Sequence, residues 1–256
     1  WTSQYYFRGI IQETQGAIFQ PGFELGFALF ESDGPVSSVG LAVGLWSSVH
    51  TGPSGKVQSA AGGPPGWYEA DFYATLSVGF LSMLEVALTY TAYLSPSGGW
   101  GPVHELAVGV GFDDSSFWAD MGAGFFTGLQ PSVTLAAELE GNAFGAKEGV
   151  YFEVGLEPGF TLYESDPITL SASIPLAVGT SAANYYDNGA GKDDPFGFFS
   201  AGATLGAALG FIPASAGAWS ISAGIQALVL GDNTSAINTN GDSVEVIGSA
   251  GIGVGF

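Results

Sequence analysis

The residues of this sequence that could do chemistry are mostly carboxylates, and many of them alternate with apolar residues. In a strand, successive side chains point to opposite faces, so these acidic residues share one face. The charged residues expected on that face are one cation, Arg8, and the carboxylates Glu24, Glu69, Asp71, Glu85, Glu105, Glu138, Glu140, Glu153, Glu157 and Glu245. Crowded carboxylates attract cations, and acidic rings give pores a cation preference. The alternative is that these groups only solvate a wet interior with water and counter-ions.

Arg8 is the one cation that the pattern places among these carboxylates. We interpret it as a structural tie to one or more of them rather than as a clamp for a substrate. The carboxylates expected to set the field of the interior are Glu69, Asp71, Glu105, Glu138, Glu140 and Glu153.

Other chemistry is weakly supported. Two loops are rich in oxygen ligands of the kind that Ca²⁺ takes, at Asp187, Asp193, Asp194, Asp232 and Asp242, although Asp is also a common turn residue. A hydrolase needs a histidine near its nucleophile, and only His50 and His104 are present. Because His104 and Glu105 are neighbours on a strand, they face opposite sides. We therefore expect no enzyme and, apart from the weak possibility of Ca²⁺, no cofactor.

Composition excludes several classes of protein. Only 11% of the 256 residues are charged, against about 25% in soluble domains, and 46% are hydrophobic. No apolar run approaches the roughly 18 residues of a membrane helix. The usual way for such a chain to satisfy its backbone in lipid is a closed β-barrel. A net charge of -20 argues against nucleic acid as a partner, and the absence of cysteine removes disulfides and thiolate metal sites.

The elements that must position the carboxylates are strands, because alternation with period 2 recurs along the chain. The clearest case is PSVTLAAELEG, residues 131–141, with Val133, Leu135, Ala137 and Leu139 on one face. Twelve strands are predicted, at 3–13, 18–30, 36–49, 67–80, 84–94, 103–112, 131–141, 149–163, 167–179, 195–211, 218–230 and 243–256. The predicted fold is an all-β, transmembrane, up-and-down antiparallel β-barrel of about 12 strands, formed by the whole chain (1–256) as one domain.

Loop lengths argue against a thirteenth strand at 113–130. Bacterial barrels have even strand numbers, short periplasmic turns and longer extracellular loops. Twelve strands put the short links on one side and nearly all the long links on the other. We therefore interpret 113–130 as a periplasmic excursion, either a short helix or a hairpin folded into the lumen.

Aromatic residues near the predicted strand ends fit two interfacial bands. Phe256 resembles the aromatic end of many outer-membrane barrels, and the alternation predicts that Tyr68 points outward with the outer band. Inward positions are unusually rich in glycine. A twelve-stranded barrel lies between the filled eight-stranded type and the open sixteen-stranded type, so these glycines favour a lumen with room for water. They are also compatible with strand curvature alone.

Several segments resemble the TorF-like (Gcw_chp) family of outer-membrane barrels. SQYYFRGIIQ resembles that family's opening SDYxFRGISQ, and WYEADFYATLSVGF is similar to its YEvDlYaGy strand. LTYTAYLSPSGG and HELAVGVGF look like its YtYPg and aEvylG elements. The sequence departs from these patterns at Gln4, at Ile11 and at Leu94–Ser95. The resemblance implies a barrel in the outer membrane, and it implies no activity or catalytic residue.

The leading hypothesis is an outer-membrane, porin-like channel of a Gram-negative bacterium for passive diffusion of small solutes, with an acidic, cation-preferring lumen. The alternative is a closed structural or surface-interaction barrel that works in adhesion or assembly through its extracellular loops. Expected partners are membrane lipid and small solutes or cations, with homo-oligomers or lateral packing against other membrane proteins as a further option. We expect that an export signal has been removed from the chain.

Overall fold

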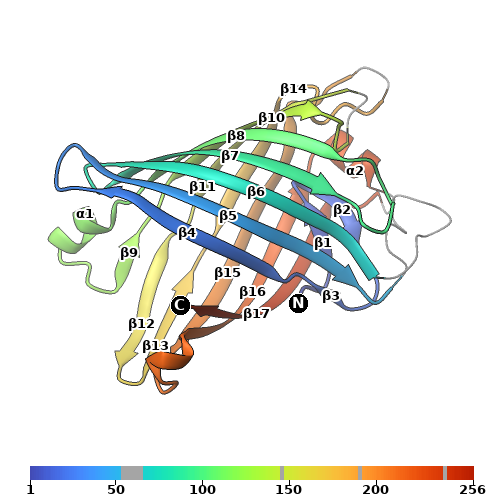
Figure 1. Cartoon of the computed structure of the whole chain (residues 1–256). Coiled ribbons are helices and arrows are strands. Elements are labelled where there is room, and N and C mark those ends of the chain that lie inside the picture. Colours follow the sequence, from blue (N-terminus) through green and yellow to red (C-terminus); the bar gives the residue numbers. More distant parts are fainter. Residues whose placement is uncertain (53–65, 145–146, 190–191, 239–240) are drawn as a thin grey trace.

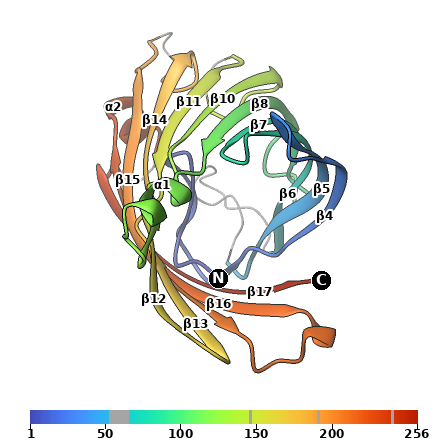
Figure 2. The ribbon, with the colours of Figure 1, turned by 90° about the vertical axis from the view of Figure 1, so that its left-hand side faces the viewer.

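The computed structural model describes residues 1–52, 66–144, 147–189, 192–238 and 241–256. Fifteen strands form one antiparallel sheet that curls into a barrel, and two short strands form a separate sheet inside it (Figures 1 and 2). The predicted all-β barrel is confirmed. The two strands of the inner sheet are β1 (Tyr5–Phe7) and β2 (Ile10–Glu13).

The wall runs through the remaining strands in chain order. The first part contains β3 (Ile18–Phe19), β4 (Gly22–Glu31), β5 (Val36–His50), β6 (Gly66–Phe80), β7 (Leu84–Leu94) and β8 (Val103–Phe112). The middle part contains β9 (Phe126–Gly128), β10 (Ser132–Glu140), β11 (Val150–Leu156), β12 (Gly159–Ser165), β13 (Ile168–Ser173) and β14 (Leu176–Ala183). The last part contains β15 (Phe196–Leu209), β16 (Ala218–Leu230) and β17 (Val244–Gly255). The described helices are α1 (Ser115–Asp120), α2 (Asp232–Ile237) and the short 3₁₀ turn η1 (Ala214–Ala216).

Several of these strands join end to end into longer strands that cross the wall, here called staves. Residues 168–173 and 176–179 pair with β15 in a single register, so β13 and β14 form one stave interrupted at Ile174–Pro175. By the same criterion β3 continues into β4, β9 into β10 and β11 into β12. The fifteen strands of the sheet therefore make eleven staves.

The two ends of the barrel differ in their connections. At one end, here called the turn end, short links join β4 to β5, β6 to β7 and β12 to β13. At the other, the loop end, longer links join β7 to β8, β14 to β15 and, through α2, β16 to β17. This is the separation expected from the loop lengths. β2 and α2 lie at the loop end, and α1 lies at the turn end (Figure 1).

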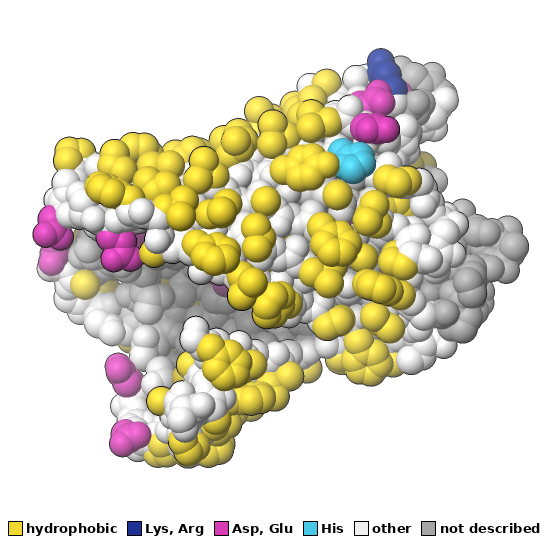
Figure 3. Space-filling view, in the orientation of Figure 1, with side chains coloured by type: hydrophobic (Ala, Val, Ile, Leu, Met, Phe, Trp, Pro, Cys, Tyr) yellow, Lys and Arg dark blue, Asp and Glu magenta, His cyan; other side chains and the backbone are white. Residues whose placement is uncertain are grey.

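The outer face of the wall is apolar. Hydrophobic side chains cover most of the face in Figure 3. Along β10, for example, Val133 and Leu135 are exposed on the outside, and similar residues stand out on every long stave, such as Phe72, Leu205 and Ile252. Exposed apolar bands of this kind are typical of strands that face lipid. Among the described helices, none combines the length and apolarity of a bilayer crossing.

The N-terminal residues close only part of the wall. Trp1, Thr2 and Ser3 exchange hydrogen bonds with Gly248 and Ala250 of β17, and the Thr2 N–H donates to the Ile18 carbonyl at 3.1 Å. Residues 1–4 thus form a seam between β17 and β3. Toward the turn end no pairing joins β4 to β17 in the described chain, and Figure 3 shows a hollow between the two parts of the wall.

The prediction of a wall strand at 3–13 is wrong. Residues 5–13 turn into the lumen as the β1–β2 hairpin, here called the plug hairpin, with Ile10, Ile11 and Glu13 buried. Arg8 and Gly9 form its two-residue tip, with φ of 50° and 81°. Two positive φ values define the tight turn that suits a β-hairpin, and Arg is an unusual residue there because the left-handed region disfavours side chains.

Tyr68 also departs from its expected direction. Ser48 pairs with Glu69 and Val49 pairs with Trp67, so Tyr68 is the extra residue of a β-bulge. A bulge locally re-aims a side chain. Tyr68 therefore points inward, is 0% exposed, and donates a hydrogen bond of 2.8 Å to Gln12 of the plug hairpin.

Residues 113–130 lie at the turn end, and they do not form a further membrane-crossing stave. They contain α1 and β9, and β9 extends the stave of β10 by pairing with β12. Trp118 of α1 packs edge-on against Phe126, which in turn contacts Phe160. Asp114 holds this segment together, because its carboxylate accepts N–H groups from Leu129, Gln130 and the Trp118 indole.

Replacing Asp114 with asparagine is expected to lower the free energy of unfolding by about 1–3 kcal/mol, the typical effect of losing hydrogen bonds to a buried charge. Burial would raise the pKa of Asp114, but the backbone N–H groups of Gln130 and Leu129 hold it below its ordinary value. The stabilisation is therefore present above pH of about 3.9 and is lost as the pH falls through the lowered pKa. Urea unfolding in detergent micelles between pH 2 and 7 measures this, and a variant with wild-type stability at neutral pH would contradict it.

Candidate functional site in the lumen

The lumen differs sharply between its two halves. Toward the loop end, inward side chains are buried, as Leu228 and Glu245 are. Toward the turn end, inward positions on the same strands, such as Ser220, Ser222 and Gly253, are exposed. There the lining is mostly Gly, Ser and Thr, around cavities of about 370 Å³ beside Glu85 and Ser132 and about 330 Å³ beside Glu157 and Ser171. The lumen is thus a small-residue vestibule that ends at a filled segment.

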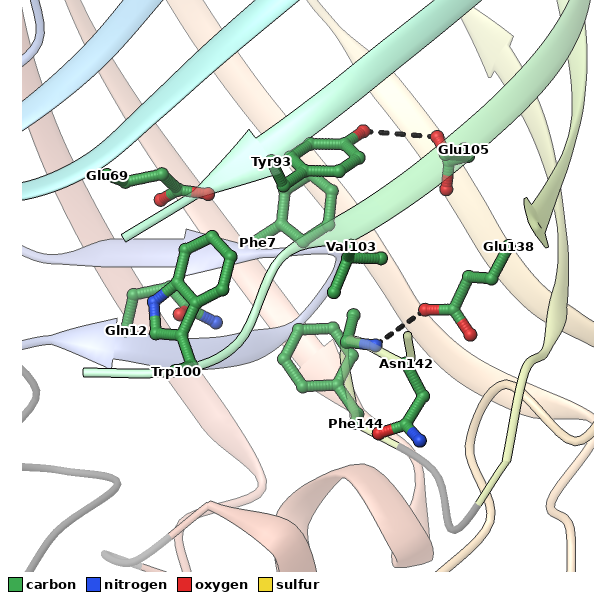
Figure 4. Close-up of a pocket in the computed structure, with 11 residues that line it drawn as sticks. Phe7, Gln12, Glu69, Tyr93, Trp100, Val103, Glu105, Glu138, Asn142 and Phe144 are labelled. Atoms are coloured by element: carbon green, nitrogen blue, oxygen red, sulfur yellow. Dashed lines mark hydrogen bonds between the residues drawn. The ribbon is translucent and has the colours of Figure 1, made fainter. Parts of the chain in front are cut away.

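Arg8 is the centre of the filled segment. Its guanidinium makes a two-point contact with the Glu105 carboxylate, at 2.6 and 2.9 Å, and donates to the Tyr185 hydroxyl at 2.8 Å. The Tyr151 ring lies 4.2 Å from the guanidinium carbon, and the rings of Phe7 and Tyr185 lie at 4.8 and 5.3 Å. Tyr93 donates to the same carboxylate (Figure 4). A planar fork-to-fork pair surrounded by aromatic rings is a strong contact for a guanidinium.

Two further inward carboxylates, Glu69 and Asp71, lie near the Arg8–Glu105 pair. Glu69 accepts a hydrogen bond of 2.7 Å from Tyr5 of the plug hairpin. Burial raises the pKa of Tyr5 well above its ordinary value, so its hydroxyl remains a donor. Asp71 is 8% exposed, and one of its carboxylate oxygens is buried without a hydrogen-bond partner. Among the described side chains that line this region, Arg8 is the sole basic group, so acidic side chains outnumber basic ones.

A cavity of about 50 Å³ adjoins these carboxylates (Figure 4). Glu69, Glu105 and Glu138 contribute acidic groups to it, and Phe7, Tyr93 and Trp100 contribute rings. The volume is enough for a few water molecules, since one water needs about 10–15 Å³ by the same measure. It is far smaller than the vestibule beyond it.

Three further predicted residues lie on nearby strands with different roles. Both carboxylate oxygens of Glu138 accept backbone N–H groups, from Ala143 and Gly149, so this side chain anchors the loop after β10. Glu153 accepts the Tyr151 hydroxyl. Glu140 follows a register shift and pairs with His104, whose ring stacks on the exposed Tyr90. Glu140 is exposed and does not join the lumenal cluster.

The remaining predicted carboxylates are spread along the barrel. Glu24 accepts a hydrogen bond from Tyr73 and lies on the inward face of β4. Glu85 lies opposite Gly79 and Gly111 near the turn end, and Glu157 borders the vestibule. Glu245 is buried beside Leu228 at the loop end. The structure thus brings together Arg8, Glu69, Asp71, Glu105 and Glu138, and it leaves the other predicted residues apart from them.

The plug hairpin has a second attachment at its far end. One Glu13 oxygen accepts the N–H groups of Thr14 and Gln15, and the other lies 3.7 Å from His50 Nδ1. His50 Nε2 lies 2.8 Å from the Ser48 hydroxyl, and the His50 ring stacks on Tyr68. These side chains are almost fully buried. The hydrogen bond from Tyr68 to Gln12 links the hairpin to the wall here, and Tyr68 in turn stacks on His50 of β5. Glu13 and His50 lie side by side without a hydrogen bond between them.

The loop aspartates are used in local hydrogen bonding. Asp193 accepts the Ser181 hydroxyl and the N–H groups of Asn184 and Tyr186. Asp187 accepts the Gly189 N–H, and Asp194 accepts those of Phe196 and Asn233. Asp232 begins α2, and Asp242 is exposed. No group of three or more metal-binding side chains gathers in the described part of the chain, so a Ca²⁺ site there stays a prediction without a geometric cluster.

The residues that sequence reasoning missed are the tyrosines around Arg8, namely Tyr93, Tyr151 and Tyr185, and the hairpin residues Tyr5, Gln12 and Glu13. Burial raises the pKa of Tyr185 well above its ordinary value, so the hydroxyl that meets Arg8 stays neutral. The clustering of aromatic residues in YYDNG and YYFRG was the available signal.

Comparison with known proteins assigns no family to this chain. No family model and no curated protein matches the sequence, so the resemblance to TorF-like barrels stays a prediction. Among solved structures, a crystal structure of the NanC porin is similar with a TM-score of 0.49 and 6% identity, over 93% of this chain and 97% of that chain. The fold assignment rests on the strand pairing of this chain itself.

Proposed function

We propose that this protein is a porin-like channel of the bacterial outer membrane for small solutes, with a preference for cations, and that the plug hairpin closes it at rest. The observation that carries the proposal is the contrast between the two halves of the lumen. A barrel with only a structural role has no need of an exposed, small-residue vestibule. The seal, in contrast, is made by one short hairpin, which polar side chains and apolar contacts, such as those of Ile10 and Tyr5, hold against the wall.

The acidic excess around Asp71 supports the cation preference. With Glu69 and Glu105 nearby and Arg8 as the neighbouring cation, an incoming positive charge lowers the repulsion between the carboxylates. An anion would add to it. The expected substrates are therefore small and positively charged or neutral.

A disulfide lock tests the channel directly. A Cβ atom at Gly9 would lie 3.2 Å from the Thr234 Cγ2 atom and 3.2 Å from Phe198, so Gly9→Cys and Thr234→Cys bring two thiols near each other. The cost is a side chain at φ of 81°, which the Gly9→Cys single variant shares. The chain has no other cysteine. The lock is placed in the Arg8→Ala background, in which we expect the channel to open. In planar bilayers we expect little conductance from the oxidised protein and recovery of conductance after reduction, on the same molecules. The single variants, oxidised in parallel, are the controls.

The second candidate is a closed barrel that acts through its loop end, and the buried tyrosines beneath the loops favour it. A variant in which residues 5–13 are replaced by a glycine–serine linker decides between the two. If that variant folds as a heat-modifiable barrel and still fails to conduct, the channel proposal is overturned and the closed barrel remains.

A further inference from the structure

We propose that the wall residues around Arg8 form a recognition site for the guanidinium group of a solute, and that Arg8 occupies this site as an internal ligand in the closed state. The inference rests on the proposed function and names the class of solute. Its components are Glu105 from β8, Tyr93 from β7, Tyr151 from β11 and Tyr185 from the loop after β14.

The geometry around Arg8 is specific for a planar cation. Glu105 meets both terminal nitrogens of the guanidinium, and Tyr185 accepts a further hydrogen bond from one of them. The Tyr151 ring covers the guanidinium carbon at 4.2 Å. A compact ammonium ion makes only point contacts and cannot reproduce the two parallel hydrogen bonds.

The wall side of the site is held independently of Arg8. Tyr93 donates to Glu105 Oε1, and Tyr151 donates to Glu153 of its own strand. Tyr151 also packs against Tyr185 and Tyr186, with ring centroids 5.1 and 6.5 Å away. Glu105 and the two covering tyrosines are at least nine-tenths buried. Removal of the Arg8 side chain therefore leaves a lined site with an uncompensated carboxylate.

The position of Arg8 makes it a replaceable ligand. It stands at the tip of a hairpin, in a two-residue turn where its φ of 50° disfavours any side chain. Its own contacts offset that strain. A solute with the same group would compete for Glu105, and the tip would lose its ion pair. Its carbonyl groups would keep their hydrogen bonds from Tyr186 and Asn238.

Binding of methylguanidinium measured by calorimetry tests the site in folded, detergent-solubilised protein. We expect Arg8→Ala to bind with a dissociation constant on the order of 1 mM, and wild type at least about tenfold more weakly because the tethered Arg8 competes. Methylammonium is expected to bind Arg8→Ala more weakly than methylguanidinium. The double variant Arg8→Ala with Glu105→Gln is expected to show no binding.

Two outcomes would overturn the site: a correctly folded Arg8→Ala protein that does not bind methylguanidinium, or equal binding by the double variant. Tyr185→Phe in the Arg8→Ala background removes only one hydroxyl, so a change in binding would not come from misfolding. We expect this variant to bind methylguanidinium more weakly than Arg8→Ala does. Calorimetry needs no ion flow, so a protein that binds methylguanidinium but never conducts refutes the channel and leaves the site standing.

Discussion

Arg8→Ala is expected to open the channel, with an equilibrium between open and closed states shifted by about 100- to 4,000-fold. Breaking a buried ion pair by removing one partner costs about 3–5 kcal/mol, and every 1.4 kcal/mol is a factor of ten. The closed state bears this cost because it keeps Glu105 buried without Arg8. When the hairpin leaves, water reaches that carboxylate. Open probability in planar bilayers measures the shift.

The double variant Arg8→Ala with Glu105→Gln gives the sharper comparison. It removes both members of the pair and leaves no buried charge, so it should open less than Arg8→Ala alone. Lys147→Ala, which removes an exposed cation, is the matched control and should behave as wild type. Equal opening by the single and double variants would show that the unpaired charge of Glu105 does not destabilise the closed state. A wild-type open probability for Arg8→Ala would show that the Arg8–Glu105 pair does not hold the hairpin.

Asp71→Asn is expected to reduce the cation preference of the open channel, tested in the Arg8→Ala background. Asp71 has a buried carboxylate oxygen without a hydrogen-bond partner in the closed state, and departure of the hairpin would expose this carboxylate to water in the open channel. Loss of one unit charge next to the ion path changes the energy of a permeating cation by about 1 kcal/mol, or roughly fivefold in relative permeability. The reversal potential in a KCl gradient reports this ratio.

Glu140→Gln provides the control for Asp71→Asn, because it removes the same charge from an exposed position beside His104. It should leave the reversal potential unchanged. An equal effect of the two substitutions would mean that overall charge, rather than the lumenal cluster, sets selectivity.

The wall of the barrel could be predicted from the sequence because alternation is a local property of each strand. The positions of Val133 and Leu135 outside and of Glu105 inside follow from it directly. Tyr68 could not be predicted in this way, since a bulge depends on how two strands pair. Its direction is decided by the match of Ser48 to Glu69, which no single strand reveals.

The plug hairpin was missed because its turn does not have the usual residues. Hairpins with positive φ at both tip positions typically use Asn-Gly or Asp-Gly, and here the pair is Arg8–Gly9. The surrounding sequence did contain a signal. Tyr5, Tyr6 and Phe7 are consecutive, as are Ile10 and Ile11, and unbroken apolar runs are typical of segments buried on both faces. A wall strand beside a wet lumen would alternate.

The seam at residues 1–4 has a consequence for assembly. Its hydrogen bonds join residues that are separated by 245 and 249 positions along the chain. These are among the contacts of longest range in the described structure. Contacts of such high sequence separation form late, because the chain between them must be ordered first. The same short segment leads straight into the plug hairpin. Formation of the seam and insertion of the plug hairpin are therefore coupled in time. We expect the channel to be closed as soon as the protein has folded.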